Sequence, residues 1–522
     1  MTPLLSREMV PGMDAPAPTR PSLPRTVWVL SGLSLALHLL PRPGYGFHRD
    51  ELLYLAMADH LEPLRMQFPP LIALLGKVAQ LLPGPTLWGT RLVSALALSA
   101  IIVIAATTAR RMGGGREAQV LAASAFLVSP LFMRAGALFQ PVVFEQLWWT
   151  VATLAFVSLL AGGDRKWWLV FGLAAGLGGL TKFSAAIFGI AVATGALLSP
   201  LRRDLRTRWP WLAVATGALV ALPSVLGQVA WDWPFLEQAR ILRETQLARV
   251  TPSAFLSDQM LSAFGAAPFL LLGLVGFFTT RRLRPFRPLG IAAVAAAILF
   301  LATGGKGYYL GPMHPALYVG GAVWAGGLLS SRPWPRRGVL AAVVAAGLVV
   351  LPMGIPLLPP PSMARYSAAV GITRAVTTNF GQVLPLPQDY ADMLGWREQA
   401  QAVARVFHGL PQEERSRTVI VGGNYGRAGA LAVYHEELGL PYPASRHGDF
   451  YAWGPGMSDP AVVLILGGSV VELLEIFEEV EDAGAVLNPM GVPEEQEVRV
   501  HICRKPREPF LQLWERLGVV WG

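Results

Sequence analysis

The 522-residue sequence has few charged residues: only 15% are Asp, Glu, Lys or Arg, whereas 53% are hydrophobic. Soluble domains contain about a quarter charged residues, so the composition argues against a soluble protein. The apolar residues also occur in runs of roughly 17–22, long enough to cross the hydrocarbon core of a bilayer. We therefore predict a polytopic α-helical membrane protein.

Cysteine is almost absent, since Cys503 is the only one. A single cysteine excludes an internal disulfide and any metal site built on several cysteine ligands. The sequence also lacks internal repeats, low-complexity tracts and the matching halves that are typical of many transporters. The net charge of +9 comes from basic clusters in short gaps between apolar runs. This is the positive-inside pattern of membrane proteins, so we expect no nucleic-acid partner.

Eleven apolar stretches are candidate membrane spans, at 26–40, 86–109, 117–133, 142–162, 167–181, 183–199, 210–229, 261–280, 288–303, 314–330 and 338–357. Basic clusters follow every second stretch, at 110–116, 163–166, 201–208, 281–287 and 331–337. All five clusters lie on the cytoplasmic face if the N-terminal tail, residues 1–25, is cytoplasmic. No small-residue cleavage site follows the first apolar run, so we expect it to be retained as a span.

With this orientation the remaining loops face away from the cytoplasm, at 41–85, 134–141, a tight turn near Lys182, 230–260 and 304–313. The odd number of spans also places everything after Pro359 outside. We therefore predict a transmembrane domain over residues 26–360, with its first outer loop at 41–85, and an extracytoplasmic domain over residues 365–522.

The tail has the pattern of a small α/β domain. Segments 417–423, 461–468 and 497–504 have the composition of short buried strands. The stretches between them, 424–440 and 470–484, favour amphipathic helices. The sequence therefore predicts strand and helix in alternation after the last span.

Glycine-rich stretches are interpreted as packing and turn signals. Gly172, Gly176 and Gly179 have the small-residue spacing that lets two membrane helices approach closely. The segment GGNYGRAG does not match G-x-G-x-x-G, so a nucleotide site is weakly supported. We expect a tight strand-to-helix turn there, with Asn424 and Gly426 in unusual backbone conformations.

The first outer loop contains GYGFHRDELLYLA, residues 44–56. Apolar residues after Asp50 and Glu51 predict a helix at the membrane interface with one wet face. Adjacent residues on a helix do not face each other, so the two carboxylates are not an opposed glycosidase-type pair. Either one of them acts as a lone general base, or Asp50 caps the helix and Glu51 is solvated.

Further polar residues lie at the outer ends of the predicted spans. Arg134, Gln140 and Glu145 occur at the outer mouth of two of them, and Glu145 lies about one turn into the membrane. An ionisable group at that depth is costly unless it is paired or functional. Glu145 therefore either pairs with Arg134 or Lys182, or has a role in function.

Lys306 lies in TGGKGYYLGPMHP, residues 303–315, and is followed by Tyr308 and Tyr309. The glycines allow a close backbone approach to a ligand, and the lysine supplies a compact cation for a phosphate. The tyrosines suit the headgroup level, where they would line a sugar or lipid site. The alternative is an ordinary aromatic belt with a snorkelling lysine. Because the carboxylates, cations and aromatics all map to one face, we expect a polar cavity there for an anionic ligand.

Several motifs together resemble bacterial membrane glycosyltransferases related to the dolichyl-phosphate-mannose protein mannosyltransferases, in the manner of glycosyltransferase family 39; aminoarabinose transferases belong to the same broad group. The motifs are GYGFHRDELLYLAMADHL, QFPPLIALL, LFQPVVFEQLWW, GLGGLTKFSA and GKGYYLGPMHPAL, followed in the tail by LGWREQAQAV, VIVGGNYGRAGAL and YAWGP. The resemblance covers most of the chain. It implies a GT-C fold of about 11 transmembrane helices in a bacterial inner membrane.

The resemblance also implies inverting sugar transfer from a polyprenyl-phosphate donor to a protein, lipid or glycan acceptor on the outer face. Asp50 matches the acidic position taken to be the catalytic base, and Glu51 its acidic neighbour. Lys182 and Lys306 match basic positions associated with the donor phosphate, to which we add Arg134. Glu145 stands where many relatives have Asp.

The remaining site residues are assigned to substrate binding, namely Arg49, Gln140, Glu145, Tyr308 and Tyr309. The sequence requires no cofactor, and it leaves open a divalent cation, Mg²⁺ or Mn²⁺, beside Asp50 and Glu51. Two other functions are considered: a flippase or transporter for lipid-linked sugars, and a membrane scaffold subunit that binds a partner through its outer domain. Transporters usually carry ionisable residues near the midplane, whereas here they gather at one face.

Overall fold

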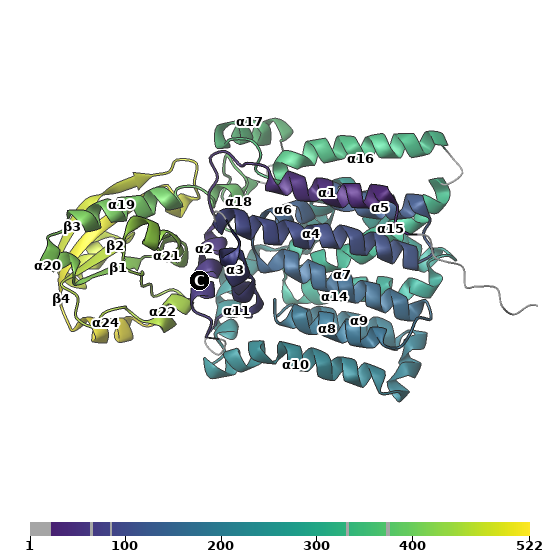
Figure 1. Ribbon diagram of the computed structural model, residues 1–522, viewed down its shortest axis with the longest axis horizontal. Coiled ribbons are helices and arrows are strands. Elements are labelled where there is room, and N and C mark those ends of the chain that lie inside the picture. Colours follow the sequence, from purple (N-terminus) through teal and green to yellow (C-terminus); the bar gives the residue numbers. More distant parts are fainter. Residues whose placement is uncertain (1–21, 63–65, 84–85, 330–332, 372–375, 522) are drawn as a thin grey trace, which may run out of the picture.

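The computed structural model describes residues 22–62, 66–83, 86–329, 333–371 and 376–521. Most of the N-terminal tail predicted to be cytoplasmic lies outside these residues, as do positions 330–332 around the last basic loop. A bundle of long helices makes up the larger part of the molecule, and a smaller part built around a four-stranded sheet covers one end of it (Figure 1).

All of the stretches predicted to span the membrane are helical. The bundle contains α1 (Arg25–Leu39), α4 (Thr86–Arg111), α5 (Arg116–Ser124), α6 (Pro130–Ala137), α7 (Pro141–Leu160), α8 (Trp167–Gly179), α9 (Ala185–Leu197), α10 (Trp209–Ala230), α12 (Pro252–Ala263), α13 (Ala267–Thr279), α14 (Arg287–Thr303), α15 (His314–Leu329) and α16 (Pro333–Gly354). Within the described chain, six helical segments are long and apolar enough to cross a membrane, and up to eight if two bent pairs each count once. The protein is therefore a multi-pass membrane protein, and the count of eleven spans stays a prediction.

The predicted span 117–133 is broken rather than continuous. Helix α5 passes into a short 3₁₀ segment, Ala125–Val128, and α6 begins at Pro130 at an angle of 66° to it. Proline lacks the backbone N–H that a continuing helix needs, and it disfavours helical geometry at the residue before it, here Ser129. The bend directs α6 and the loop after it toward the end of the bundle covered by the sheet part.

Short helices lie at the end of the bundle that is nearer to the sheet part (Figure 1). They are α2 (Arg49–Asp59), α3 (Leu71–Leu81), α11 (Pro234–Thr245), α17 (Pro360–Val370) and α18 (Gln388–Ala391). The interface helix predicted after Asp50 is α2, but the expected wet face is wrong, since residues 51–58 are all buried. Helix α3 packs on one side of α2 and a helix of the sheet part packs on the other, so little of α2 reaches solvent.

The sheet part contains β1 (Thr418–Gly422), β2 (Val462–Leu466), β3 (Phe477–Leu487) and β4 (Glu497–Pro506), with the helices α19 (Trp396–Gly409), α20 (Gln412–Arg415), α21 (Tyr425–Leu438), α22 (Asp449–Trp453), α23 (Val470–Leu474) and α24 (Phe510–Leu517). The strand order is β1-β2-β4-β3, with β1 parallel to β2 and the other pairs antiparallel. Alternating strand residues form two cores, one beneath α19 and α21 and the other beneath α24. The predicted α/β character of the tail is thus confirmed.

The helix predicted over residues 470–484 is mostly wrong. Only α23 is helical, and the acidic run after it forms the edge strand β3. Acidic residues in a row have a fair helix propensity, but strand β4 beside them is basic. Glu479 pairs with Lys505, and Glu481 with Arg504 across the two strands. These cross-strand pairs favour the sheet, a tertiary effect that local propensity does not include.

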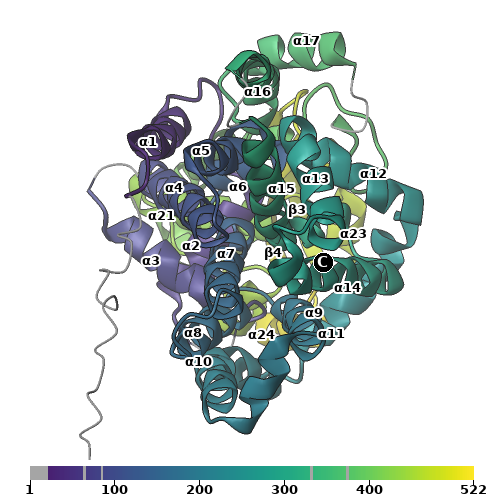
Figure 2. The ribbon, with the colours of Figure 1, turned by 90° about the vertical axis from the view of Figure 1, so that its right-hand side faces the viewer.

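The basic loops gather at the end of the bundle opposite to the sheet part. Arg25, Arg110, Arg111 and Arg116 line one hollow at that end. Arg282, from another predicted basic loop, donates a hydrogen bond to the carbonyl oxygen of Gly113 at 2.5 Å. Figure 2 looks along the helices from this end, with the sheet part behind them. These basic residues therefore lie together at one end of the bundle, as the sequence predicts.

Helices α8 and α10 approach each other at glycine. A Cβ atom at Gly172 would lie 2.3 Å from the carbonyl oxygen of Ala213, and one at Gly176 would lie 2.8 Å from that of Gly217. Neither distance is tolerated between real atoms, so the backbones of the two helices meet directly. The close helix contact predicted from the small-residue spacing is confirmed.

We expect Gly172→Ala to lower the melting temperature of the detergent-solubilised protein, because α8 must move away from α10. The matched control is Gly189→Ala in α9, where nothing lies within 4 Å of an added Cβ. There the better helix propensity of alanine, worth about 0.5–1 kcal/mol, should stabilise the protein or leave it unchanged. Equal melting temperatures for the two variants would contradict the close contact.

Candidate functional site

Asp50 lies in the first turn of α2, but it does not cap the helix. The cap is His48, whose Nδ1 accepts a hydrogen bond from the backbone N–H of Asp50 at 3.1 Å. The backbone N–H of His48 in turn donates to Oε2 of Glu51 at 2.8 Å, which completes a capping box. The expectation that Asp50 caps α2 is therefore wrong, and its carboxylate is available for other contacts.

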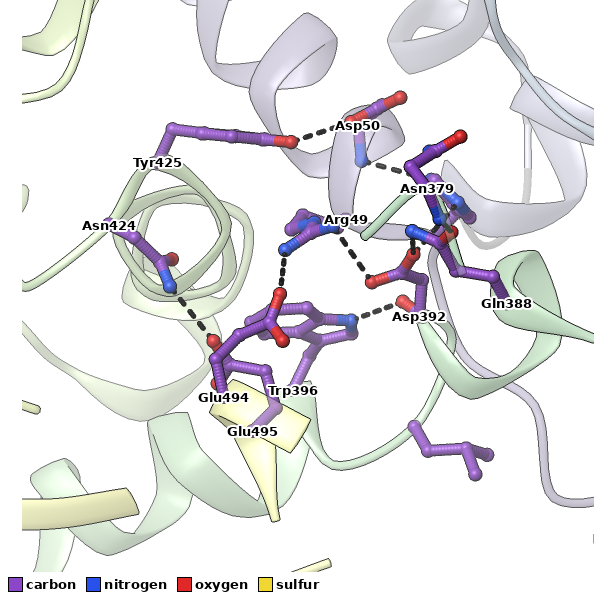
Figure 3. Close-up of polar contacts among 12 residues, drawn as sticks. Arg49, Asp50, Asn379, Gln388, Asp392, Trp396, Asn424, Tyr425, Glu494 and Glu495 are labelled. Carbon is purple, nitrogen blue, oxygen red and sulfur yellow. Dashed lines mark hydrogen bonds and ion pairs between the residues drawn. The ribbon is translucent and has the colours of Figure 1, made fainter. Parts of the chain in front are cut away.

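Two neutral donors from distant parts of the chain bind the carboxylate of Asp50. The amide Nε2 of Gln140, which precedes α7, donates to Oδ2 at 2.9 Å. The hydroxyl of Tyr425, the first residue of α21, donates to Oδ1 at 3.0 Å. Figure 3 shows this tyrosine reaching Asp50 from the sheet part. Asp50 therefore lies where the bundle and the sheet part meet, and it is half-buried.

Glu51 is buried and has a structural environment. Its side chain is 1% exposed, so the expectation that it is solvated is wrong. Oε2 accepts the backbone N–H of His48, and Oε1 accepts the backbone N–H of Phe139 at 2.8 Å. Glu51 thereby joins the start of α2 to the loop before α7, and so fixes the positions of Asp50 and Gln140 relative to each other.

Arg49, predicted to bind substrate, joins the first outer loop to the sheet part (Figure 3). Its guanidinium lies 3.2 Å from Oδ1 of Asp392 and 2.8 Å from Oε1 of Glu494, and 5.7 Å from the ring centre of Tyr425. Burial raises the pKa of Asp392 to about 6, an effect that the charge of Arg49 partly offsets. The charge of Arg49 is thus committed to two carboxylates, Asp392 before α19 and Glu494 of the sheet part.

Lys182 and Glu145 form an ion pair, with 3.5 Å between Nζ and Oε2. Glu145 is 1% exposed and also accepts a hydrogen bond from the hydroxyl of Ser184. The ion pair with Lys182, one of the alternatives considered for Glu145, is therefore present. Nζ of Lys182 lies 4.6 Å and 5.3 Å from the ring centres of Tyr309 and Tyr308, so the lysine and both tyrosines form one cluster.

Lys306 differs from the other cations of the site. Its Nζ donates to the side-chain oxygen of Gln246 at 2.6 Å, and across the residues that the structure describes no carboxylate lies within ion-pair distance of it. Burial, followed by the charge of Lys182, lowers the pKa of Lys306 to about 8, although Asp50 and Asp389 partly oppose this shift. Helix α7 links these groups, since Gln140 before its first turn binds Asp50 and Glu145 in its second turn binds Lys182, which contacts Tyr308 and Tyr309 beside Lys306.

Arg134 lies beside the C-terminal part of the chain. It pairs with Oδ2 of Asp389 at 3.1 Å, donates to the carbonyl oxygen of Met353 at 2.7 Å, and lies over the ring of Tyr390 at 5.1 Å. Asp389 balances the charge of Arg134, as Glu145 balances the charge of Lys182. Among the three cations assigned to a phosphate, Lys306 is the one whose polar contact is neutral.

One glycine from each of two motifs, Gly307 and Gly426, serves packing within the protein. A Cβ at Gly307 would lie 2.3 Å from that of Asp258, so this glycine allows a helix contact rather than a ligand approach. Asn424 and Gly426 lack the unusual backbone that we expected, since Asn424 is extended with φ −147° and Gly426 has no positive φ. A Cβ at Gly426 would instead lie 2.7 Å from Cγ of Arg49, because α21 packs directly on α2.

Sequence reasoning missed Tyr425, Asp392 and Glu494. Tyr425 is 375 residues from Asp50, and its motif was interpreted as a turn. The position of a tyrosine directly after a helix N-cap does not indicate which residue its hydroxyl will bind. Here the packing of α21 on α2 determines that the partner is Asp50. The sequence thus predicts the polar residues of the bundle but not those of the sheet part.

Glu51 is not free to share a divalent cation with Asp50. Both of its oxygen atoms accept backbone N–H groups and its side chain is 1% exposed, whereas each oxygen of Asp50 accepts one side-chain donor and keeps a second lone pair. In the described part of the chain, no three His, Cys, Asp or Glu side chains are arranged to hold a metal ion.

Comparison with known proteins identifies the fold. The crystal structure of ArnT from Cupriavidus metallidurans bound to undecaprenyl phosphate matches with a TM-score of 0.56 and 16% identity, over 91% of this chain and 97% of that chain. The apo structure of the same protein matches with a TM-score of 0.53 and 15% identity, over the same shares of the two chains. At these identities the likeness establishes the fold, which is that of the GT-C glycosyltransferases.

The sequence comparison matches a shorter part of the chain than the structural comparison does. Residues 67–226 match the family described as dolichyl-phosphate-mannose-protein mannosyltransferase. No curated protein matches the sequence significantly. The resemblance seen in the motifs is thus confirmed for this segment and for the fold.

Glu51→Gln should destabilise the protein, whereas Asp50→Asn should not. A glutamine at position 51 has one carbonyl oxygen for two backbone N–H donors, and leaving one buried donor unpaired costs about 1–3 kcal/mol. An asparagine at position 50 keeps an oxygen for a hydrogen bond in a half-buried position. Thermal unfolding in detergent separates the two, and a Glu51→Gln variant as stable as wild type would contradict the structural role.

Proposed function

We propose that the protein is an inverting glycosyltransferase that transfers a sugar from a polyprenyl-phosphate donor to an acceptor at the outer face of the bacterial cytoplasmic membrane. The observation that carries the proposal is the placement of Asp50 and Lys306 around the start of α7, where Gln140 binds Asp50 and Glu145 binds Lys182 beside Tyr308 and Tyr309. An anionic base and a cation without a carboxylate partner lie at the same end of a GT-C bundle. These are the two charges that such a transfer needs.

In the proposed reaction an oxygen or nitrogen of the acceptor attacks the anomeric carbon of the sugar. The new bond forms as the bond from that carbon to the phosphate oxygen breaks, and its electron pair leaves with the polyprenyl phosphate. The proton of the acceptor moves to the carboxylate of Asp50. General-base help of this kind contributes about 10²–10⁴ in rate.

The leaving phosphate gains negative charge as the bond breaks, and Lys306 stabilises that charge in a poorly hydrated site. Lys182 and Arg134 have carboxylate partners, so their net field at the phosphate is weaker. Tyr308 and Tyr309 lie beside Lys182 and flank the sugar–phosphate end of the donor. Glu51 and Arg49 support the site through the protein contacts described above.

The proposed orientation rests on charge. The arginine-rich end of the bundle faces the cytoplasm by the positive-inside rule, so the opposite end, with Asp50 and the sheet part, faces outward. Nucleotide sugars belong to the cytoplasm, so a donor for this end must arrive on a lipid. The fold is similar to that of ArnT, which has been crystallised with undecaprenyl phosphate.

Asp50→Asn should abolish sugar transfer without loss of folded protein, because an amide cannot take the proton of the acceptor. Cells that lack the protein are complemented with wild type or with Asp50→Asn. Mass spectrometry of their outer-face lipids, glycans and glycoproteins then detects the added sugar. The matched control is Asp59→Asn at the far end of α2, where Gln80 and Lys77 are the partners.

Three results would contradict the proposal. If Asp50→Asn cells contain the same glycoside as wild type, Asp50 is not the base. A flippase would instead move polyprenyl-phosphate sugar across vesicles in both variants and form no glycoside. A scaffold would require the sheet part but be indifferent to Asp50 and Lys306.

Binding of undecaprenyl phosphate should weaken above pH 8. The pKa of Lys306 is lowered to about 8, so its charge is present below that pH and is lost as the pH rises through it. The phosphate, with a second pKa near 6, stays fully ionised in that range. We expect the dissociation constant to rise several-fold between pH 7.5 and 9.5, at most about tenfold per pH unit.

The dissociation constant of the detergent-solubilised protein for undecaprenyl phosphate measures this effect. Lys306→Arg keeps its charge and should bind with little dependence on pH, while Lys306→Gln should bind weakly throughout. A wild-type affinity that is constant over this range would remove Lys306 from the phosphate site.

A further inference from the structure

We infer that Tyr425 is a positioning residue for Asp50, so that the sheet part completes the active site. This inference rests on the proposed function, because it concerns how the base of that reaction is held. It assigns a role to a residue of the C-terminal part of the chain that neither the motifs nor the fold comparison indicates. The role follows from three features of the structure.

The first feature is the contact itself. Tyr425 donates its hydroxyl hydrogen to Oδ1 of Asp50, while Gln140 donates to Oδ2. Burial, followed by the negative charge of Asp50, raises the pKa of Tyr425 well above its usual value. The phenol therefore remains protonated and acts as a donor throughout the physiological range. A hydrogen bond to the charged form of a carboxylate favours that form, which is the form that a base requires.

The second feature is the support behind Tyr425. Asn424 caps α21 through the backbone N–H of Arg427 at 2.8 Å, and its amide donates to Oε1 of Glu495 at 2.8 Å (Figure 3). Glu495 is 1% exposed, and its Oε2 accepts from Gln399 at 3.0 Å and from Arg427 at 3.1 Å. A buried carboxylate with this many donors fixes the turn before Tyr425 rigidly.

The third feature is the contact between α21 and α2. A Cβ at Gly426 would lie 2.7 Å from Cγ of Arg49, and one at Gly429 would lie 2.8 Å from Cβ of Leu52. Glycine residues of α21 thus meet α2 on both sides of Asp50, at Arg49 and at Leu52. Because the two helices are in direct contact at both points, the hydroxyl of Tyr425 has one fixed position relative to the carboxylate.

The neutral character of the two donors, Tyr425 and Gln140, matters for the proposed chemistry. Both are neutral, so they orient the carboxylate of Asp50 without cancelling the charge that takes up a proton. Each oxygen of a carboxylate has two lone pairs. One on each oxygen is used by Tyr425 or Gln140, and the other remains for the acceptor. Loss of the phenol should therefore impair the chemical step rather than donor binding.

The test is Tyr425→Phe, which removes the hydroxyl and keeps the ring. The matched control is Tyr434→Phe on the same helix, whose ring packs on Phe47. We expect Tyr425→Phe to lower kcat about 10–100-fold, the effect of one hydrogen bond to a charged group. The KM for the polyprenyl-phosphate donor should stay unchanged, and the acid limb of the kcat/KM profile should move to higher pH.

A second measurement does not depend on activity. A hydrophobic carbodiimide modifies protonated carboxyl groups, and mass spectrometry of Asp50-containing peptides gives the extent of modification at each pH. In membranes that contain the full chain, Tyr425→Phe should be modified at Asp50 at higher pH than wild type or Tyr434→Phe. Because this experiment needs no purified protein, it also covers a variant that is unstable in detergent.

The outcomes separate the two proposals. If wild type transfers sugar and Tyr425→Phe does so with the same kcat and pH profile, the positioning role is overturned and the glycosyltransferase stands. A lower kcat with an unchanged pH profile and a lower melting temperature also overturns it, since Tyr425 would then serve only docking. If wild type makes no glycoside but the carbodiimide result holds, the contact stands and the proposed reaction fails.

Discussion

The ion pairs of Arg49 with Asp392 and Glu494 are the interaction on which the site depends. They join the first residue of α2 to two separate segments of the C-terminal part, and the backbone N–H of Arg49 also donates to the carbonyl oxygen of Asp392. Asp392 is buried, so an isolated charge there would be costly without this partner. Because Asp50 follows Arg49 directly, whatever fixes the arginine also fixes the start of α2 and the carboxylate beside it.

Arg49 is also the nearest cation to Asp50 in the sequence, and its partners explain why it leaves Asp50 free. A guanidinium shared between Asp392 and Glu494 is a poor partner for a third carboxylate. Asp50 is left with Gln140 and Tyr425, which are neutral. Two other cations of the site also have carboxylate partners, since Lys182 pairs with Glu145 and Arg134 pairs with Asp389. One anion and one cation, Asp50 and Lys306, remain without an opposite charge in contact, in the described part of the site.

The sequence predicts those features that depend on local pattern. Apolar length predicts the bundle helices, the spacing of Gly172 and Gly176 predicts the α8–α10 contact, and the loop positions predict that polar residues gather at one end. The errors concern tertiary contacts. From its sequence context Glu51 was expected to be solvated, but two backbone N–H donors bind it in the buried interior. The composition of β3 favours a helix, but the segment pairs with the basic strand β4. Tyr425 was missed because its partner is 375 residues away.

A catalytic centre at such a junction has a physical advantage for transfer at a membrane surface. In the proposed reaction the lipid chain of the donor lies against the apolar helices of the bundle, whereas a polar acceptor approaches from water, where the sheet part lies. Asp50, the proposed base, lies between these two phases and accepts one hydrogen bond from each side: from Gln140 of the bundle and from Tyr425 of the sheet part. Such a carboxylate is oriented only when both parts of the molecule are in place. The geometry of the base therefore depends on the assembly of the whole chain rather than on the membrane bundle alone.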